Sequence, residues 1–239
     1  MTRARLDTEA PRRDHLFWDG VYWTLVVAAL VASVFGYASS TRTLFFFGVI
    51  SLAIGIYAGF IEPRWLRITR YRLPLVAHPS EWMTIAFLSD FHAGRYKSKR
   101  FFDRVARLTE RENPHIVVIG GDAVDELTDR ITDLSACKDI HPPQGKFFLF
   151  GNHDYLDDPN ALAQMWRAWG YRDLTNRREM IQVHHRSLEL VGWDDSWQGQ
   201  PITDSATIAR EKLIPRVLFV HEPDALLDIL DGTADLIVM

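Results

Sequence analysis

The sequence predicts an α/β fold of layered sheets that follows a helical hairpin. Two observations lead to this fold class. From Thr84 to the last residue, short apolar runs typical of buried strands alternate with segments of helical periodicity, which is the pattern of an α/β sheet protein. Before Thr84 stand two runs without a charged residue, at 21–38 and 44–61. We therefore expect a hairpin over residues 21–62 and one domain over residues 84–239, a length that can bury a substantial core.

The two uncharged runs have the length of membrane-spanning helices. Each has 18 residues, at the short end of the roughly 17–25 that a helix needs to cross a bilayer. The SSTRT segment between them fits a tight turn. The alternative is a buried helical hairpin of a soluble protein, but two wholly uncharged runs this close together favour a transmembrane hairpin.

Basic residues predict the orientation of this hairpin. Four arginines lie in the tail over residues 1–20 and four lie between Arg64 and Arg72, whereas the turn carries only Arg42. Because positive flanks stay in the cytoplasm, we expect both ends and the domain on the cytoplasmic face of the inner membrane. An exported domain is the alternative, since the Arg12-Arg13 pair precedes an apolar run as in twin-arginine signals. The second apolar run and the lack of a small-x-small cleavage site argue against export.

Residues 63–83 connect the hairpin to the domain. They interleave Arg, Trp and Tyr, which is typical of a connector at the membrane interface, although a solvated linker is the alternative for any single residue.

The domain predicts strands and helices in alternation. Strands are expected at 84–89, 115–120, 146–150 and 216–220, at 235–239, and as an antiparallel pair at 179–183 and 187–193. Helices are expected at 98–113, 158–170 and 223–232. The helix at 158–170 has clear boundaries, because Asp158 can cap it, Pro159 suits its first turn and Gly170 ends it.

Composition excludes several function classes. The formal net charge of -4 and the pI near 6.1 predict no nucleic-acid partner, which would favour a strongly basic face. The one cysteine, Cys137, excludes an intramolecular disulfide and a cysteine-based zinc site. Its LSACKDI surroundings carry no pattern typical of a nucleophile, so we expect a structural thiol.

Metal-capable side chains directly follow four of the predicted strands. In chain order they are Asp90 and His92, then Asp122, then Asn152, His153 and Asp154, and finally His221. In open α/β sheets, ligands gather at the carboxyl ends of the strands. Each motif alone has an ordinary explanation, such as a turn or a surface histidine. Their succession at four strand ends predicts a functional site.

These motifs resemble a known family. DFH, GGD, GNHD and the later histidine are similar to the first four sequence blocks of the calcineurin-like metallophosphoesterases, from about residue 84 to the end. The IEPRWLRITRYRLP segment and GWDD at 192–195 are similar to a membrane-associated bacterial branch of that superfamily. The resemblance implies a layered sandwich of two mixed sheets flanked by helices. It also implies hydrolysis of a phosphodiester or pyrophosphate bond by water activated between two divalent metal ions.

The resemblance implies a metal-binding role for five of these residues. Asp90 and His92 would bind the first metal, Asn152 and His221 would bind the second, and Asp122 would bridge the two. Ligands of this kind, with both oxygen and nitrogen atoms, favour manganese, iron or zinc.

Two further residues would act on the substrate. By resemblance, His153 would stabilise the transition state or protonate the leaving oxygen, and Asp154 would orient its ring. By the same resemblance, Trp193, Asp194 and Asp195 would shape the cavity wall.

The last metal-binding block of the family, Gly-His-Thr-His, follows a strand that this chain begins as DLIVM. We therefore expect the second sheet to be incomplete at the C-terminus and one imidazole of each metal to lie beyond this sequence, which would be a fragment. Glu222 stands where the branch usually has asparagine.

Two functions stay open at this point. One is a membrane-anchored, metal-dependent phosphoesterase whose full-length form carries all the ligands. The other is an inactive membrane module that keeps the fold but cannot hold two metals. Fold alone does not fix a substrate. The expected location at the membrane favours a lipid-linked phosphoester or pyrophosphate, such as a UDP-diacylglucosamine-type lipid A precursor or a phospholipid.

Overall fold

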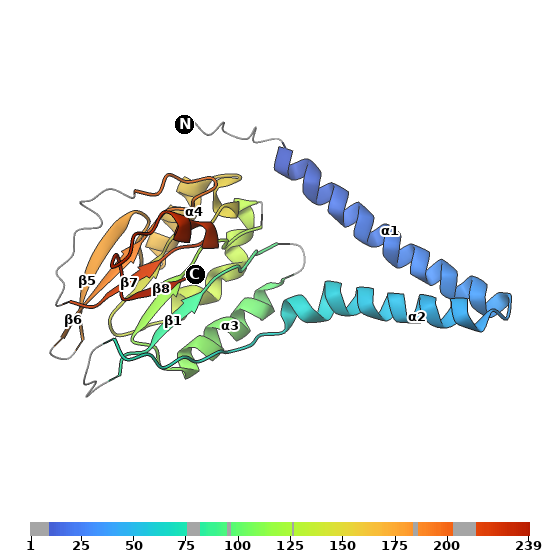
Figure 1. Ribbon diagram of the computed structural model, residues 1–239, viewed down its shortest axis with the longest axis horizontal. Coiled ribbons are helices and arrows are strands. Elements are labelled where there is room, and N and C mark those ends of the chain that lie inside the picture. Colours follow the sequence, from blue (N-terminus) through green and yellow to red (C-terminus); the bar gives the residue numbers. More distant parts are fainter. Residues whose placement is uncertain (1–9, 76–81, 95–96, 126, 184–185, 203–213) are drawn as a thin grey trace. The chain divides into compact units, whose positions relative to one another are not determined.

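A computed structural model describes residues 10–75, 82–94, 97–125, 127–183, 186–202 and 214–239 (Figure 1). The part of the predicted connector at 76–81 lies outside these residues. The chain divides into two compact units, Met1–Ile68 and Thr69–Met239.

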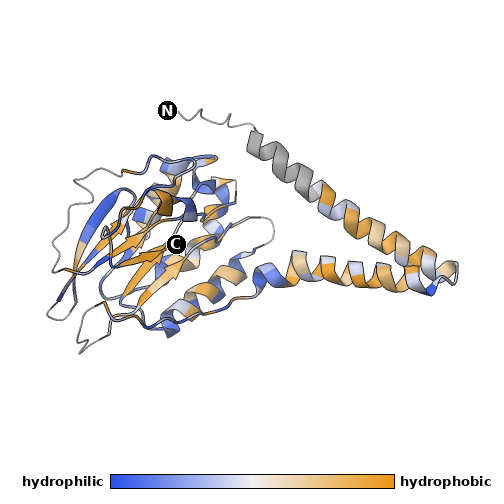
Figure 2. Cartoon of the chain, in the orientation of Figure 1, coloured by the Kyte–Doolittle hydropathy of each residue, from blue (hydrophilic) through white to orange (hydrophobic). Residues whose placement is uncertain are grey.

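The first unit is a helical hairpin. Helix α1 spans Ala10–Ala38 and α2 spans Arg42–Ile56, and a π-helical turn (Tyr57–Ile61) and a 3-10 turn (Glu62–Arg64) follow. The predicted tail over residues 1–20 is thus helical from Ala10 onward. The stretches Gly20–Ala38 and Arg42–Arg64 are long and apolar enough to cross a membrane, with mean hydropathies of 1.8 and 2.3. Only 17% and 6% of these two stretches are buried. Hydrophobic residues, drawn in orange, predominate along both (Figure 2).

Small residues let the two helices pack closely. A Cβ atom added at Gly48 of α2 would lie 2.4 Å from Ser33 Oγ and 2.8 Å from the Ala29 carbonyl oxygen of α1. The Tyr22 hydroxyl donates a hydrogen bond of 2.7 Å to the Gly55 carbonyl oxygen. Close approach at small residues, with interhelical hydrogen bonds, is how membrane helices associate without a hydrophobic driving force between them.

The second unit contains the two sheets that the resemblance implies. The first sheet has the order β1-β2-β3-β4 and is parallel throughout: β1 is Ile85–Leu88, β2 Ile116–Ile119, β3 Lys146–Phe148 and β4 Tyr171–Asp173. Its connections contain α3 (Lys99–Arg111), the 3-10 segment η3 (Thr128–Asp139), the 3-10 turn η4 (His153–Tyr155) and α4 (Pro159–Ala168). The Asp158 side chain caps α4 as predicted, by accepting a hydrogen bond of 2.9 Å from the Ala161 amide.

The second sheet is mixed. Strands β5 (Arg177–Val183) and β6 (Arg186–Gly192) form the predicted antiparallel pair, and β7 (Arg216–Phe219) and β8 (Leu236–Val238) continue the sheet in parallel. The helix predicted at 223–232 is only a short 3-10 turn, η5 (Pro223–Leu227). A proline at the start and a glycine at the end, here Pro223 and Gly232, are as common in turns as at helix boundaries, so the sequence pattern did not distinguish the two.

The main core lies between the two sheets. Ile116, Val118 and Phe147 of the first sheet pack in one buried cluster with Leu190 and Phe219 of the second. On the first sheet's other side, Phe148 stacks on Trp166 of α4. Both faces of β1–β3 are covered, which explains why their sequences are mainly apolar. The polar groups of a functional site therefore gather where these strands end.

Candidate metal centre

The predicted site residues stand on four loops that leave the carboxyl ends of strands. Asp90 and His92 follow β1, Asp122 follows β2, and His221 follows β7. Asn152 and His153 follow β3, where His153 begins the 3-10 turn η4. The parallel register brings the ends of β1, β2 and β3 to one edge of the first sheet.

Three of these residues have a left-handed backbone that residues other than glycine rarely adopt. The φ angles are 58° at Asp90, 42° at His92 and 53° at Asp122. Such conformations cost on the order of 1–3 kcal/mol each and persist only where neighbouring structure holds them. Here the two loops hold each other, because the His92 amide donates to the Asp122 carbonyl oxygen at 2.8 Å and the Asp90 amide to that of Gly121 at 3.1 Å.

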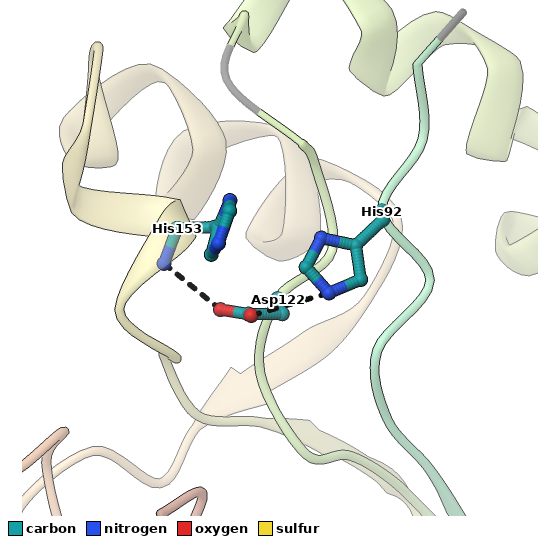
Figure 3. A group of neighbouring side chains, drawn as sticks. All are labelled: His92, Asp122 and His153. Atoms are coloured by element: carbon teal, nitrogen blue, oxygen red, sulfur yellow. Dashed lines mark hydrogen bonds and ion pairs between the residues drawn. The ribbon is translucent and has the colours of Figure 1, made fainter. Parts of the chain in front are cut away.

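Asp122 lies at the centre of the site. It is 3% exposed, and its two carboxylate oxygens face different histidines. Oδ2 lies 3.4 Å from His92 Nε2, and Oδ1 lies 3.4 Å from His221 Nε2. Oδ1 also accepts a hydrogen bond of 2.9 Å from the His153 amide. Figure 3 shows His92, Asp122 and His153 converging from three separate loops.

Glycines make this convergence possible. A Cβ atom added at Gly151 would lie 2.3 Å from Asp122 Oδ1, and one at Gly121 would lie 2.5 Å from the Gly151 nitrogen. At both positions the absence of a side chain allows close approach of the backbone to the site.

Two groups of side chains can each hold a metal ion, and they share Asp122. One group is His92, Asp122 and His153, and the other is Asp90, Asp122 and His221, with ligand atoms within 4.8 Å of one another in each. A carboxylate common to two such groups fits a pair of divalent cations, and the imidazole and carboxylate donors suit transition metals.

Electrostatics links the acidic and basic members of the site. Burial alone would lower the pKa of His92, but the carboxylates of Asp125, Asp90 and Asp122 raise it to about 9. Burial likewise opposes protonation of His221, but Asp122 raises that pKa to about 9 as well. The hydrogen bond to His92 lowers the pKa of Asp90 to about 2.

Asn152 precedes η4 and is partly buried. Within the described part of the chain, its side-chain amide makes no hydrogen bond, so its carbonyl oxygen is available to a cation. The partial burial of Asn152 and its position directly after β3 are compatible with the ligand role expected for it.

The ring of His153 is held by a residue that the sequence analysis did not assign. His153 Nδ1 lies 2.5 Å from the Asp125 carbonyl oxygen, and the Asp125 carboxylate lies 3.4 Å from His92 Nδ1. Asp154, expected to orient this ring, is buried elsewhere: its carboxylate accepts from the Ala123 amide at 2.8 Å and the Gly151 amide at 3.0 Å. Asp154 therefore joins the loops rather than holding the ring. Asp125 could have been predicted as a site residue, because it ends the GGDAVD segment that contains Asp122.

Asp194 and Asp195 fix the segment that follows β6. Asp194 accepts hydrogen bonds from the Tyr155 hydroxyl and from the Gln200 amide, the latter at 2.8 Å. Asp195 is fully buried and accepts from the Trp197 amide at 2.9 Å. Tyr155 belongs to η4, so this segment is tied to the loop that carries His153.

The predicted structural thiol has a matching environment. Cys137 is buried, and its burial raises its pKa to about 12, which keeps it protonated and unreactive.

Comparison with known proteins gives relatives for this arrangement. The chain is 29% identical over 176 residues to phosphodiesterase YaeI of Escherichia coli (strain K12), covering 71% of this chain and 63% of the relative. It is 24% identical over 187 residues to the uncharacterized metallophosphoesterase YkuE of Bacillus subtilis (strain 168), covering 75% and 65%. It is 32% identical over 106 residues to UDP-2,3-diacylglucosamine pyrophosphatase LpxG of Chlamydia trachomatis, covering 42% and 32%. The chain thus spans less than two thirds of the length of these relatives.

The sequence pattern of one family covers more than half of the chain. It matches residues 83–235, which include both sheets up to the residue before β8 and all seven predicted site residues. The chain belongs to the calcineurin-like phosphoesterase family.

Proposed function

We propose that this protein is a membrane-anchored, metal-dependent phosphoesterase that hydrolyses a phosphodiester or pyrophosphate bond. The observation that carries the proposal is the placement of Asp122, whose two oxygens each lie 3.4 Å from a histidine of a different loop. A buried carboxylate shared by two groups of ligands is the arrangement that two adjacent divalent cations require.

The side chains divide between the two cations. By the family resemblance, Asp90 and His92 would hold the first, Asn152 and His221 the second, and Asp122 both, with manganese, iron or zinc as the fitting ions. The structure groups them differently around Asp122, with Asp90 beside His221 and His92 beside His153, while Asp90 Oδ1 also lies 3.7 Å from His92 Nε2. When bound, the two cations would supply a hydroxide nucleophile at neutral pH and offset charge on the phosphate oxygens. The glycines at 121 and 151 let the loops approach closely enough for one carboxylate to serve both groups.

His153 is the group placed to act on the substrate. A carbonyl oxygen can only accept a hydrogen bond, so the contact with Asp125 makes His153 Nδ1 the donor. This contact fixes the plane of the ring. We assign to His153 the donation of a proton to the leaving oxygen of the substrate, a step that requires the imidazolium form with both ring nitrogens protonated.

The hairpin supports a substrate at the membrane. Two windows with hydropathies of 1.8 and 2.3 that remain 17% and 6% buried have the length and exposure of membrane spans. Arginines on both flanks favour a domain on the cytoplasmic side of the inner membrane. One relative is named for a lipid-linked pyrophosphate. We therefore favour a lipid-linked phosphoester or pyrophosphate as substrate.

The experiment compares Asp122→Asn with His153→Ala in the full chain, purified in detergent. Metal content after dialysis and hydrolysis of an aryl phosphodiester with added manganese are measured together. We expect Asp122→Asn to lose both metal and activity, and His153→Ala to keep its metal with turnover lowered on the order of 10²–10⁴-fold. Equal metal content and equal activity in the two variants would refute the division of roles. A native chain that binds at most one ion and is inactive would support the inactive membrane module.

A further inference from the structure

Lys97 contacts the turn that carries Asp90 and His92. Its ammonium donates hydrogen bonds to the Phe91 carbonyl oxygen at 2.7 Å and to the Asp90 carbonyl oxygen at 3.2 Å. Lys97 stands two residues before α3 begins, and its ammonium lies 5.8 Å from the centroid of the Phe101 ring in that helix. One side chain therefore connects the metal-binding turn to the start of a helix.

This turn needs an external support. Its two ends, Asp90 and His92, have φ angles of 58° and 42°, and between them the ring of Phe91 is buried edge-on against Phe102 of α3. Among the residues that the structure describes, no backbone amide donates to the carbonyl oxygens of Asp90 and Phe91. An ammonium with three donors can satisfy both at once and fix the plane of each peptide.

We propose that Lys97 is a positioning residue for the metal centre, because its two hydrogen bonds fix the directions in which the Asp90 and His92 side chains leave the backbone. The inference rests on the proposed metal-dependent function. The ammonium of Lys97 donates to two backbone carbonyl oxygens and lies over the Phe101 ring, so we expect it to act through the two ligands and not on the substrate. Partners one shell outside a metal site orient the ligands and change metal affinity when removed.

The positive charge of Lys97 lowers metal affinity, whereas its hydrogen bonds to the turn are expected to raise it. An ammonium near the site repels a divalent cation, so loss of the charge alone would strengthen metal binding. Loss of the turn geometry would weaken it. The two effects differ in sign, and a measurement of affinity therefore separates them.

The test uses manganese binding to the full chain in detergent, measured by titration calorimetry. We expect Lys97→Met to raise the dissociation constant on the order of 10–100-fold. Lys97→Arg, which keeps the charge and the donors, should recover most of this loss. Lys99→Met is the matched control, since Lys99 pairs with Asp103 at 2.7 Å on the surface of α3, and it should change the constant by less than about twofold.

A second readout reports ligand geometry directly. Cobalt bound to the Met variant should show a visible absorption spectrum different from that of the native chain, whereas the Lys99→Met spectrum should be unchanged. If the Met variant does not fold, Lys97→Gln, with one donor group and no charge, replaces it and should bind manganese more weakly than both Lys97→Arg and the Lys99→Met control. Unchanged or tighter manganese binding in the folded variants would overturn the inference. Normal metal retention by Asp122→Asn would instead indicate failure of the proposed function.

Discussion

At the scale of single residues, the site holds protons where the proposed cations would bind. The carboxylates around His92 and His221 raise both pKa values to about 9, compared with an ordinary value of 6.5. A cation requires the neutral imidazole, so metal binding must displace these protons. Metal affinity and folding stability are therefore both linked to pH in this protein.

The sign of this linkage is fixed by the raised pKa values. In metal-free protein, protonated His92 and His221 stabilise the fold fully below pH 6.5, and this contribution is lost as the pH rises through about 9. Urea unfolding of EDTA-treated chain should thus show decreasing stability across this window. At pH 7.5, calorimetry in buffers of different ionisation enthalpy should detect proton release on manganese binding. Absence of proton release at that pH would show that the rings are neutral before metal binds.

Asp154 gives a second prediction at this scale. Burial raises its pKa to about 7, while the amides of Gly151 and Ala123 donate to its two oxygens and favour the ionised form. Asp154→Asn replaces one acceptor by an NH₂ group, which leaves a buried amide without a partner and should cost about 1–3 kcal/mol of unfolding free energy. Asp157→Asn is the control, because its one bond to the exposed Thr128 amide can be kept by rotation. Equal stability of the two variants in urea would contradict this role.

At the scale of elements, the apolar runs predicted the strands well. Strands β1, β2 and β3 and the β5–β6 hairpin lie where the sequence placed them, because each is bounded by turn residues and faces a core. Strand β4 was missed, since YRD has three residues, only one of them apolar. The 3-10 segment η3 was missed because its charged residues form no periodic pattern.

The hairpin allows a prediction about helix packing. Gly48→Ala should strain the hairpin by about 1–3 kcal/mol, because the added Cβ would lie 2.4 Å from Ser33 Oγ and 2.6 Å from the Ser33 nitrogen. Trypsin should then cut faster at Arg42 in the turn, in detergent and as followed by mass spectrometry. Gly20→Ala is the control, since nothing lies within 4 Å of a Cβ there. The same cleavage rate in both variants would show that the helices do not depend on this contact.

At the scale of the whole molecule, the sequence predicted the candidate ligands but not their geometry. Asp90, His92 and Asp122 could be predicted because the parallel strands β1, β2 and β3 end at one edge of the first sheet, and His221 could be predicted because it follows β7 of the second sheet. The role of Asp125 depends on how two loops fold over each other, and the contacts of Asp154 depend on the same crossing. Spacing in the sequence does not encode that crossing.

Orientation in the membrane is the prediction that concerns the chain as a whole. A fluorescent protein that matures only in the cytoplasm, fused after Arg72, should be active, and alkaline phosphatase fused at the same position should not. The arginines on both flanks of the hairpin are the physical reason. Activity of the phosphatase alone would favour the exported alternative.

The central claim is that Asp122 joins two cations, and electron paramagnetic resonance of the manganese-loaded full chain tests it most directly. Two Mn²⁺ ions held about 3.5–4 Å apart by a shared carboxylate are magnetically coupled. We predict a coupled spectrum for the full-length protein and its loss in Asp122→Asn. A spectrum of isolated Mn²⁺ alone in the full-length protein, at saturating manganese, would contradict the account.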